Sequence, residues 1–406
     1  MPFGFGAAVL LLLLGALLEL PILAALGIVV AGAALVHQLW VRNGLTGVEY
    51  SRRLERSRAA FGEDIGLTID IWNRKRLPLA WVRADDAAAE GVAVRGRELV
   101  SDELNRRALR NTWTLAPFER VQRQLWVSAE RRGLFSIGPT ELVVGDLFAR
   151  EAARTELERV DRFLVWPRVV PALGVAHADR WGDLDRAHGG LIDDPARFAG
   201  VRTYSPGDPL RRLHNRTSAR LGEPVTKRFE PARERQLLIA LDIDTGSGWA
   251  GSADEELEAL YVMCASLVRA LAAGGAAFGL TAAGYTRTRE RFADVALGRG
   301  DGHADRVLDV LARLSHFQSA SYEVLLARIP RRFGRGTTVL ALTMREPAPF
   351  FGRLRRLRHA GFGVALLCAG PSAGEWVEQA RAAGFVARAA ALDGDWRSAT
   401  RLAVSR

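Results

Sequence analysis

Cysteine is scarce in this chain of 406 residues, which carries only Cys264 and Cys368. Each of the two lies inside an apolar run. Two such residues can build neither a disulfide framework nor a cysteine-based zinc site. The sequence therefore favours a reducing compartment.

Lysine is nearly absent as well. Lys75 and Lys227 are the only two, so 54 of the 56 basic residues are arginine. Neither lysine stands in the pattern G-x-x-x-x-G-K-[ST], which excludes a Walker phosphate-binding loop and argues against ATP hydrolysis by this chain. The formal net charge of +10 would suit a nucleic acid or an anionic membrane. No dense basic run is interleaved with aromatic residues, so we expect arginine spread over ordinary surfaces and no nucleic-acid partner.

Length and composition describe a folded protein of more than one domain. Apolar residues make up 49% of the chain and charged residues 25%, which is too hydrophobic for a disordered protein. At roughly 150 residues per domain, the length predicts two or three domains.

Two long uncharged runs open the sequence, Met1 to Leu18 and Leu20 to Val41, with Glu19 between them. Each is close to the ~20 residues that a helix needs to cross the hydrocarbon core. Leu20-Pro21 is a natural turn, so residues 1–41 are predicted to form two transmembrane helices. A cleavable signal peptide would carry Lys or Arg ahead of the first run, and none is there. One long anchor lying deeper in a single leaflet is the alternative.

Basic residues follow the second run closely, whereas none precedes the first. The positive-inside rule then places the remainder of the chain in the cytoplasm, on the inner (cytoplasmic) membrane. The arginines on which this orientation depends are Arg42, Arg52, Arg53, Arg56 and Arg58.

Residues 42–150 are predicted to form a β-sandwich. Leu67, Ile69 and Ile71 alternate with polar residues, which is typical of half-buried strands. Turn signals such as Leu77-Pro78 and Gly138-Pro139 recur at the short spacing of a small sandwich. The following residues, 151–235, are less periodic and are interpreted as a connecting segment with functional loops.

Residues 236–406 alternate between apolar runs and amphipathic segments, which predicts a doubly wound α/β domain with a mostly parallel sheet. Ser252 and Glu255 form a capping box at the start of the first helix. The expected strands are 237–241, 276–282, 337–343, 363–368 and one near Val386. The expected helices follow Ser252 and cover 307–314, 324–329, 354–359 and 375–383.

Two motifs of the α/β region are interpreted as accidental. Residues 246–251 match G-x-G-x-x-G, but Asp242 and Asp244 would lie beside the pyrophosphate of a dinucleotide, and no ribose-binding acid follows the next strand. Residues 370–374 match the nucleophile elbow G-x-S-x-G. His359 is the last histidine of the chain, so no base follows Ser372 in hydrolase order.

Asp242, Asp244 and Ser247 are the candidate metal ligands. They follow the first strand of the α/β region, and ligands of such sheets bind beyond the carboxyl ends of the strands. Two carboxylates and a hydroxyl are hard oxygen ligands that suit Mg²⁺. An aspartate at a strand end is also commonly a helix cap or a solvated loop residue.

The densest polar stretch runs from Arg202 to Arg220. Ser205-Pro206-Gly207-Asp208 is a turn, and Asp208 can pair with arginines on either side of it. The stretch is interpreted either as a structural ion-pair network or as a ligand or partner site. The residues in question are Arg202, Tyr204, Pro206, Gly207, Asp208, Arg211, His214, Ser218 and Arg220.

These features together resemble the bacterial family called domain of unknown function fifty-eight. The resemblance rests on the helical hairpin, on Arg132-Gly133-Leu134-Phe135-Ser136-Ile137-Gly138-Pro139 and on the segment Arg202-x-Tyr204-x-Pro206-Gly207-Asp208-x-x-Arg211 with Ser218-Ala219-Arg220, and it covers nearly the whole chain. Asn215 stands where the family usually has tryptophan.

The C-terminal part of that family is similar to a von Willebrand factor A domain, whose metal site uses Asp-x-Ser-x-Ser, a distant Thr and a distant Asp. Asp242 fits the first position, but Asp244 and Gly246 replace the serines, and Met344 or Arg345 stands where an acid is expected. The resemblance therefore implies a degraded metal site. It also implies a membrane-tethered partner of a MoxR-like AAA ATPase in the maturation of protein complexes, with no catalytic activity.

Three hypotheses follow. The first is a membrane-anchored, non-enzymatic interaction protein that needs no cofactor. The second is a metal-assisted hydrolase that uses Asp242 and Asp244 with His214 as base. The third is a basic surface that binds anionic lipid or nucleic acid.

Overall fold

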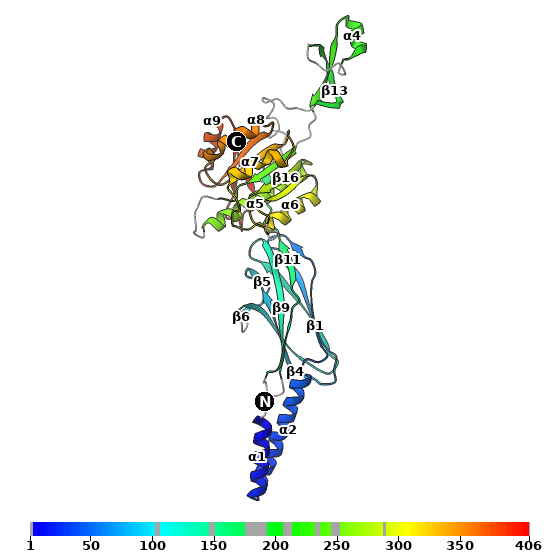
Figure 1. Ribbon diagram of the computed structural model, residues 1–406, viewed down its shortest axis with the longest axis vertical. Helices are drawn as coiled ribbons and strands as arrows, with labels where there is room; N and C mark the ends of the chain where they lie inside the picture. Colours follow the sequence, from blue (N-terminus) through cyan, green and yellow to red (C-terminus); the bar gives the residue numbers. More distant parts are fainter. Residues whose placement is uncertain are drawn as a thin grey trace. The chain divides into compact units, whose positions relative to one another are not determined.

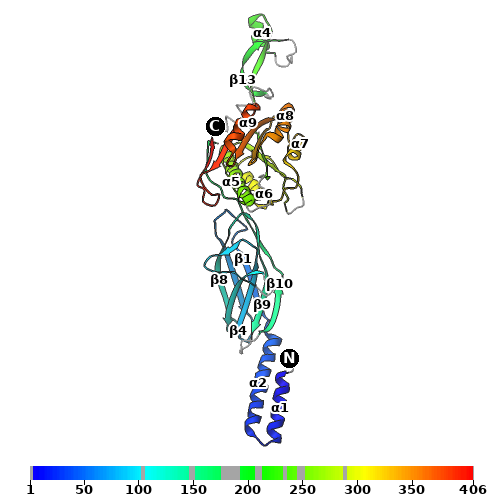
Figure 2. The ribbon, with the colours of Figure 1, turned by 90° about the vertical axis from the view of Figure 1, so that its left-hand side faces the viewer.

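A computed structural model divides the chain into two compact units, Met1–Trp166 and Pro167–Arg406 (Figures 1 and 2). The structure describes residues 3–101, 106–145, 151–174, 193–205, 213–231, 236–244, 252–286 and 290–405. The chain is therefore a multidomain, sheet-rich protein that begins with apolar helices.

Two helices open the first unit, α1 (Phe3–Leu17) and α2 (Pro21–Asn43). They lie side by side in both ribbon views (Figures 1 and 2). Close packing depends on small residues, because a Cβ atom added at Gly15 would lie 2.6 Å from the backbone nitrogen of Ala24. Among the described residues, one stretch, Pro21–Gln38 in α2, is long and apolar enough to cross a membrane, and the apolar part of α1 is shorter.

A β-sandwich forms the rest of the first unit. One sheet has the order β1-β3-β8-β5, from strands β1 (Val48–Leu54), β3 (Ile65–Asn73), β8 (Arg120–Ala129) and β5 (Val92–Val94). The other has the order β2-β11-β9-β4-β7-β6, from β2 (Arg58–Ala59), β11 (Asp161–Val165), β9 (Gly133–Gly145), β4 (Leu79–Ala88), β7 (Arg107–Leu115) and β6 (Val100–Ser101).

The period-two pattern explains the core of the sandwich. Ile65, Leu67, Ile69 and Ile71 point to the same face of β3 and are fully buried. The module does not end at residue 150 as predicted, because β10 (Glu151–Leu157) and β11 both pair with β9. Only part of the expected connecting segment is therefore a connection.

The second unit contains an eight-stranded mixed sheet of order β12-β21-β20-β19-β18-β15-β16-β17. Its strands are β12 (Ala172–Leu173), β15 (Gln236–Leu241), β16 (Ala277–Ala282), β17 (Ala293–Gly298), β18 (Thr338–Thr343), β19 (Gly363–Ala369), β20 (Val386–Leu392) and β21 (Leu402–Ser405). The five strands from β20 to β16 are parallel, whereas β17 and β21 pair antiparallel with their neighbours.

Helices cover this sheet. Residues of α7 (Tyr322–Arg332), α8 (Phe351–His359) and α9 (Ala373–Ala382) share one buried cluster with β15, β18 and β19. The remaining helices, α5 (Ser252–Ala273) and α6 (Asp301–Arg313), pack against each other (Figure 1). Burial on both faces explains why the central strands are continuous apolar runs.

A two-stranded hairpin is separate from the three larger sheets. Strands β13 (Asp193–Thr203) and β14 (Val225–Pro231) pair antiparallel, and the short helix α4 (Asn215–Leu221) lies between them in sequence. This hairpin carries most of the described part of the polar stretch that begins at Arg202.

Candidate functional site

The candidate site lies where the strand order of the α/β sheet reverses. Strand β15 has β16 on one side and β18 on the other, so the chain connections leave in opposite directions from β15 and β18. Doubly wound sheets bind ligands in the crevice beyond the strand ends at this point. Asp242 directly follows β15, and Arg345 follows β18 by two residues.

The carboxylate of Asp242 is buried, with 1% of the residue exposed. Thr343 donates from Oγ1 to its Oδ2 at 3.0 Å, and Arg345 donates from Nε to the same oxygen at 2.8 Å. The backbone N–H of Asp244 donates to Oδ1 at 3.3 Å. Neighbouring groups of the same chain thus bind both carboxylate oxygens.

Burial raises the pKa of Asp242 to about 6, and the hydrogen bonds and charge of Arg345 act in the opposite direction. Burial alone would lower the pKa of the Arg345 guanidinium, but the hydrogen bond and charge of Asp242, together with the charges of Asp244 and Glu323, outweigh it, and the net pKa is raised. At neutral pH the two groups therefore form an ion pair.

Arg345 also reaches the second predicted ligand. Its Nη1 lies 3.1 Å from Oδ2 of Asp244, whose side chain is about one third exposed. The guanidinium thus lies between the two carboxylates that were expected to hold Mg²⁺. Ser247, the third expected ligand, lies outside the described residues, and the described residues contain no group of three or more His, Cys, Asp or Glu that could hold a metal ion.

We call the surface beyond the carboxyl ends of β15, β16 and β18 the strand-end face. A loop between α6 and α7 forms its rim. Ser315 and Ser319 donate backbone N–H groups to carbonyls just after β16, which fixes the loop at this edge of the sheet. Between them, His316 contacts Glu258 of α5 through Nε2 at 2.9 Å. The next side chain, Phe317, is 75% exposed, and Tyr285 nearby is 46% exposed.

Glu255, the second residue of the predicted capping box, has partners far along the chain. Its carboxylate accepts a hydrogen bond from the indole of Trp396 at 2.5 Å and pairs with Arg397 at 2.7 Å. The first turn of α5 is therefore tied to the segment that precedes β21.

The described signature residues of the polar stretch have structural roles in the hairpin. His214 is the N-cap of α4, and its Nδ1 accepts a hydrogen bond from the N–H of Thr217 at 3.2 Å. Ser218 accepts a hydrogen bond from the N–H of Val225 at 3.0 Å, which ties α4 to β14. The N–H of Tyr204 donates to the carbonyl of Pro224 at 2.9 Å.

The other signature residues divide into two groups. Arg202 and Arg220 are exposed, and Arg202 donates to the carbonyl of Thr203 at 3.2 Å. Pro206, Gly207, Asp208 and Arg211 lie outside the described residues, as does the whole glycine motif 246–251. Asn215 is the first residue of α4.

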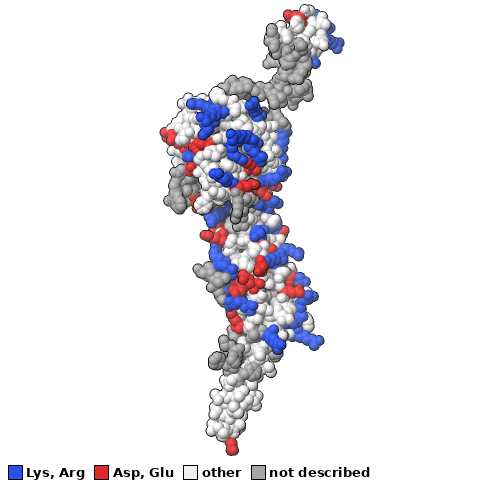
Figure 3. Space-filling model, viewed as in Figure 1, with Lys and Arg blue, Asp and Glu red and all other residues white. Residues whose placement is uncertain are grey.

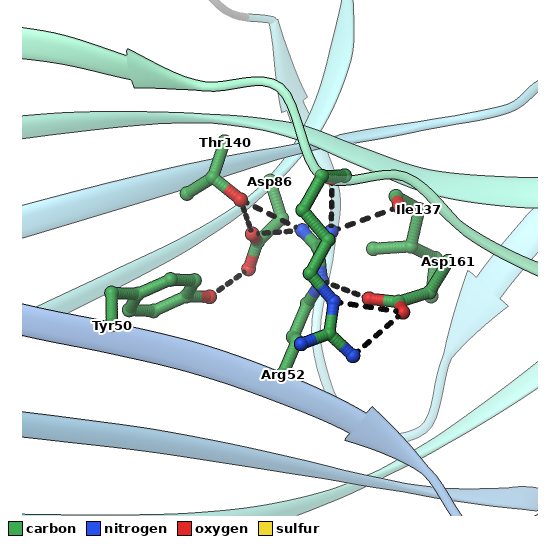
Figure 4. A network of polar contacts seen from close by, with 7 residues as sticks. Tyr50, Arg52, Asp86, Ile137, Thr140 and Asp161 are labelled. Carbon is green, nitrogen blue, oxygen red and sulfur yellow. Dashed lines mark hydrogen bonds and ion pairs between the residues drawn. The ribbon is translucent and has the colours of Figure 1, made fainter.

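Sequence reasoning missed a buried ion network in the sandwich (Figure 4). Arg52, counted above among the arginines that orient the membrane helices, is 2% exposed inside the sandwich. It pairs with Asp86 and donates from Nε to Asp161 at 3.0 Å. It also donates to Thr140 and to the carbonyls of Ile137 and Arg159, so each of its nitrogens has acceptors.

Gly138 of the sequence signature makes room for this network. Its φ is +101°, which favours glycine. A Cβ atom there would collide with the carbonyl oxygen of Arg159 and with Nη2 of Arg52. One glycine of the signature is therefore required by the buried arginine.

One family model matches part of this chain. Residues 200–339 match the model of the family described as "Protein of unknown function DUF58". The DUF58 match includes the last residues of β13, all of α4 and β14, and Asp242 and Asp244, and it ends inside β18, before Arg345. It is narrower than the resemblance drawn from the sequence.

The uncharacterized protein YeaD of Bacillus subtilis is 24% identical over 287 residues, which are 68% of this chain. The match spans 64% of that relative, less than two thirds of its length.

Several solved structures are similar to parts of the chain. The CARDB domain of the PF1109 protein from Pyrococcus furiosus, in complex with di-metal ions, covers 29% of this chain and 86% of its own at 9% identity and a TM-score of 0.20. A cohesin module from Clostridium perfringens covers 30% and 97% at 10% identity and a TM-score of 0.20. Trypsin-activated alpha-2-macroglobulin from Escherichia coli covers 41% and 9% at 16% identity and a TM-score of 0.22. These TM-scores are too low to support an argument about fold or function.

Proposed function

We propose that this chain is a membrane-anchored, non-catalytic interaction protein whose strand-end face in the α/β domain docks a protein partner. The observation that carries the proposal is the closed ion cluster of Asp242, Asp244 and Arg345. A guanidinium within 3.1 Å of both carboxylates opposes the binding of a divalent cation between them. The same cluster counts against the metal-assisted hydrolase.

The proposed docking face has the chemistry of an interface. Phe317 and Tyr285 are exposed aromatic side chains on its rim, and aromatic residues are enriched at the centres of protein interfaces. At neutral pH the Asp242–Asp244–Arg345 cluster keeps a net charge of −1, because two carboxylates share one guanidinium. The strand order β17-β16-β15-β18-β19-β20 is the doubly wound order 3-2-1-4-5-6, which supports the von Willebrand factor A-like interpretation of the domain.

The helices α1 and α2 form the proposed anchor. Many of their leucines and isoleucines are exposed, such as Leu17 at 79% and Ile22 at 80%. Burial of these side chains in the hydrocarbon core of a membrane would remove them from water. Arg52 is buried in the sandwich, so it no longer contributes to the positive-inside argument for the orientation of the anchor. Arg42, Arg53, Arg56 and Arg58 remain exposed and still favour a cytoplasmic location for the sandwich and the α/β domain.

The partner we propose is a MoxR-like AAA ATPase, as the resemblance to the DUF58 family implies. The chain has no Walker loop of its own, so an ATPase partner would supply the energy for the maturation of protein complexes. Tagged full-length protein, solubilised from its native membrane, is expected to recover this ATPase.

The test uses matched surface variants. Phe317→Ser together with Tyr285→Ser removes both rim aromatics and should reduce recovery of the ATPase at least about tenfold, as expected for interface anchors. Trp126→Ser, which removes an exposed aromatic side chain from β8 in the other unit, is the control and should leave recovery unchanged. Recovery of other proteins without any AAA ATPase would refute the partner, and equal recovery by both variants would refute the docking face.

A further inference from the structure

The end of the sandwich that follows α2 is joined to that helix by hydrogen bonds. Lys75 donates from Nζ to the carbonyl of Asn43 at 2.9 Å and also to that of Gly44. The N–H of Arg74 donates to the carbonyl of Gly47 at 2.8 Å. The loop after β3 is therefore fixed beside the last turn of α2, where orphan carbonyls favour a cation.

A second loop, between β7 and β8, is held against the first. The buried side chain of Asn73 donates to the carbonyls of Leu77 at 3.0 Å and Ala116 at 2.9 Å, one in each loop. The N–H of Phe118 donates to the carbonyl of Lys75 at 3.3 Å. The two loops and the end of α2 thus form one rigid face, which we call the helix-exit face.

Phe118 is the unusual residue of this face. Its φ is +58°, a conformation that bulky residues rarely adopt, and 59% of the residue is exposed. The neighbouring apolar residues Leu79 and Leu115 are fully buried in the sandwich. Phe118 therefore adds nothing to the core, and its backbone conformation costs free energy.

The segments that form the helix-exit face also carry basic side chains, at the end of α2 and in the loop after β3. Arg42 and Arg76 are exposed and form no ion pair with any residue in the described parts of the chain. Arg74 is also exposed, although it pairs with Glu49 at 2.6 Å. Figure 3 shows that the helical hairpin is uncharged except near its tip and that basic side chains begin on the adjoining sandwich.

We propose that the helix-exit face binds the surface of an anionic lipid bilayer, with Phe118 in the headgroup region and Arg42 and Arg76 at lipid phosphates. This inference rests on the proposed anchoring by α2. A helix that crosses the bilayer from Pro21 ends at the interface near Asn43, and the hydrogen bonds above then hold Phe118 at the same level. Exposed apolar side chains beside basic ones are typical of surfaces that lie in the membrane interface.

The test uses full-length protein reconstituted into vesicles of phosphatidylcholine alone or mixed with phosphatidylglycerol. Phe118→Cys is labelled with an environment-sensitive fluorophore, which is selective because Cys264 and Cys368 are both buried. In the anionic vesicles we expect a blue-shifted emission that lipids brominated near the headgroup quench. Trp126→Cys, labelled at an exposed position of the same sandwich six residues beyond the start of β8, is the control and should stay unquenched.

Charge variants test the role of the arginines. Arg42→Gln with Arg76→Gln should weaken contact of the labelled site with the anionic surface by roughly twenty-fold to thirty-fold, since each basic residue near such a surface contributes about fivefold. Quenching should then fall to the level seen in phosphatidylcholine vesicles. Co-flotation of the protein with the vesicles measures the anchor independently.

Each outcome decides between the two proposals. A label at position 118 that stays in water while the protein floats with the vesicles overturns the inference and leaves the anchor intact. Protein that does not float overturns both. Quenching that is equal in neutral and anionic vesicles overturns the role of anionic lipid.

Discussion

Replacing Arg345 by methionine should expose the cost of the buried carboxylate that it neutralises. The Asp242 side chain is fully buried, so the variant would leave an uncompensated charge in the interior. Breaking a buried ion pair in this way costs about 3–5 kcal/mol, and the 22% exposure of the Arg345 side chain favours the lower end of that range. A loss of about 3 kcal/mol corresponds to roughly a hundredfold change in the unfolding equilibrium.

The effect should depend on pH. The pKa of Asp242 is raised from 3.8 to about 6, so its contribution to stability is fully present below about pH 4 and is lost as the pH rises through 6. Without Arg345, which lowers this pKa, the carboxyl group would stay protonated to a higher pH. The variant should therefore be close to the wild type at pH 5 and much less stable at pH 8.

Hydrogen exchange of the full-length protein in detergent, followed by mass spectrometry, measures this locally in β15 and β18. At pH 8 these strands should exchange roughly a hundredfold faster in the variant. The double variant Asp242→Asn with Arg345→Met should recover most of the protection, and Arg335→Met, at an exposed position of the same domain, should match the wild type. Equal protection of wild type and Arg345→Met at pH 8 would refute the ion-pair account.

Two further predictions concern the sandwich, and both can be measured by hydrogen exchange of β3 and β9. Arg52→Met should destabilise the sandwich by about 3–5 kcal/mol because it leaves Asp86 buried without its partner, whereas Arg53→Met, at the exposed neighbouring position, should change its stability by less than about 0.5 kcal/mol. Gly138→Ala should cost roughly 2–4 kcal/mol, since the added methyl group combines a positive φ with a collision against Arg159; unchanged protection of β9 would contradict this.

Much of the α/β domain could be predicted from the sequence because both faces of its central strands are buried. Leu237 to Leu241 forms a continuous apolar run, and amphipathic helices separate it from the next such runs. The strands β17 and β21 were missed, since a short antiparallel strand at the edge of a sheet or next to it buries only part of its surface and resembles a loop in sequence. The extension of the sandwich beyond residue 150 was missed for a related reason. Strand β10 pairs with β9 outside the main strand order of its sheet, and none of its residues is buried.

The candidate site was predicted in part. Asp242 and Asp244 could be placed because carboxylates after the first strand of such a sheet meet the ligand crevice. Arg345 was noted as a departure from an acidic position, but its reach to both aspartates depends on the register between β15 and β18, which the sequence does not reveal. Arg52 was assigned to the arginines that flank the membrane helices. Its burial depends on pairing with residues of the other sheet, which the sequence does not reveal.

Titration of Mn²⁺ into full-length protein at pH 8, followed by calorimetry, tests most directly whether the strand-end face is closed by Arg345. At this pH Asp242 is ionised, so protonation does not compete with a metal. The account predicts no binding that depends on Asp242 in the wild type, because the guanidinium already occupies the space between the carboxylates. Saturable binding of one Mn²⁺ ion that disappears in Asp242→Asn would contradict it and would restore the metal site that the sequence first indicated.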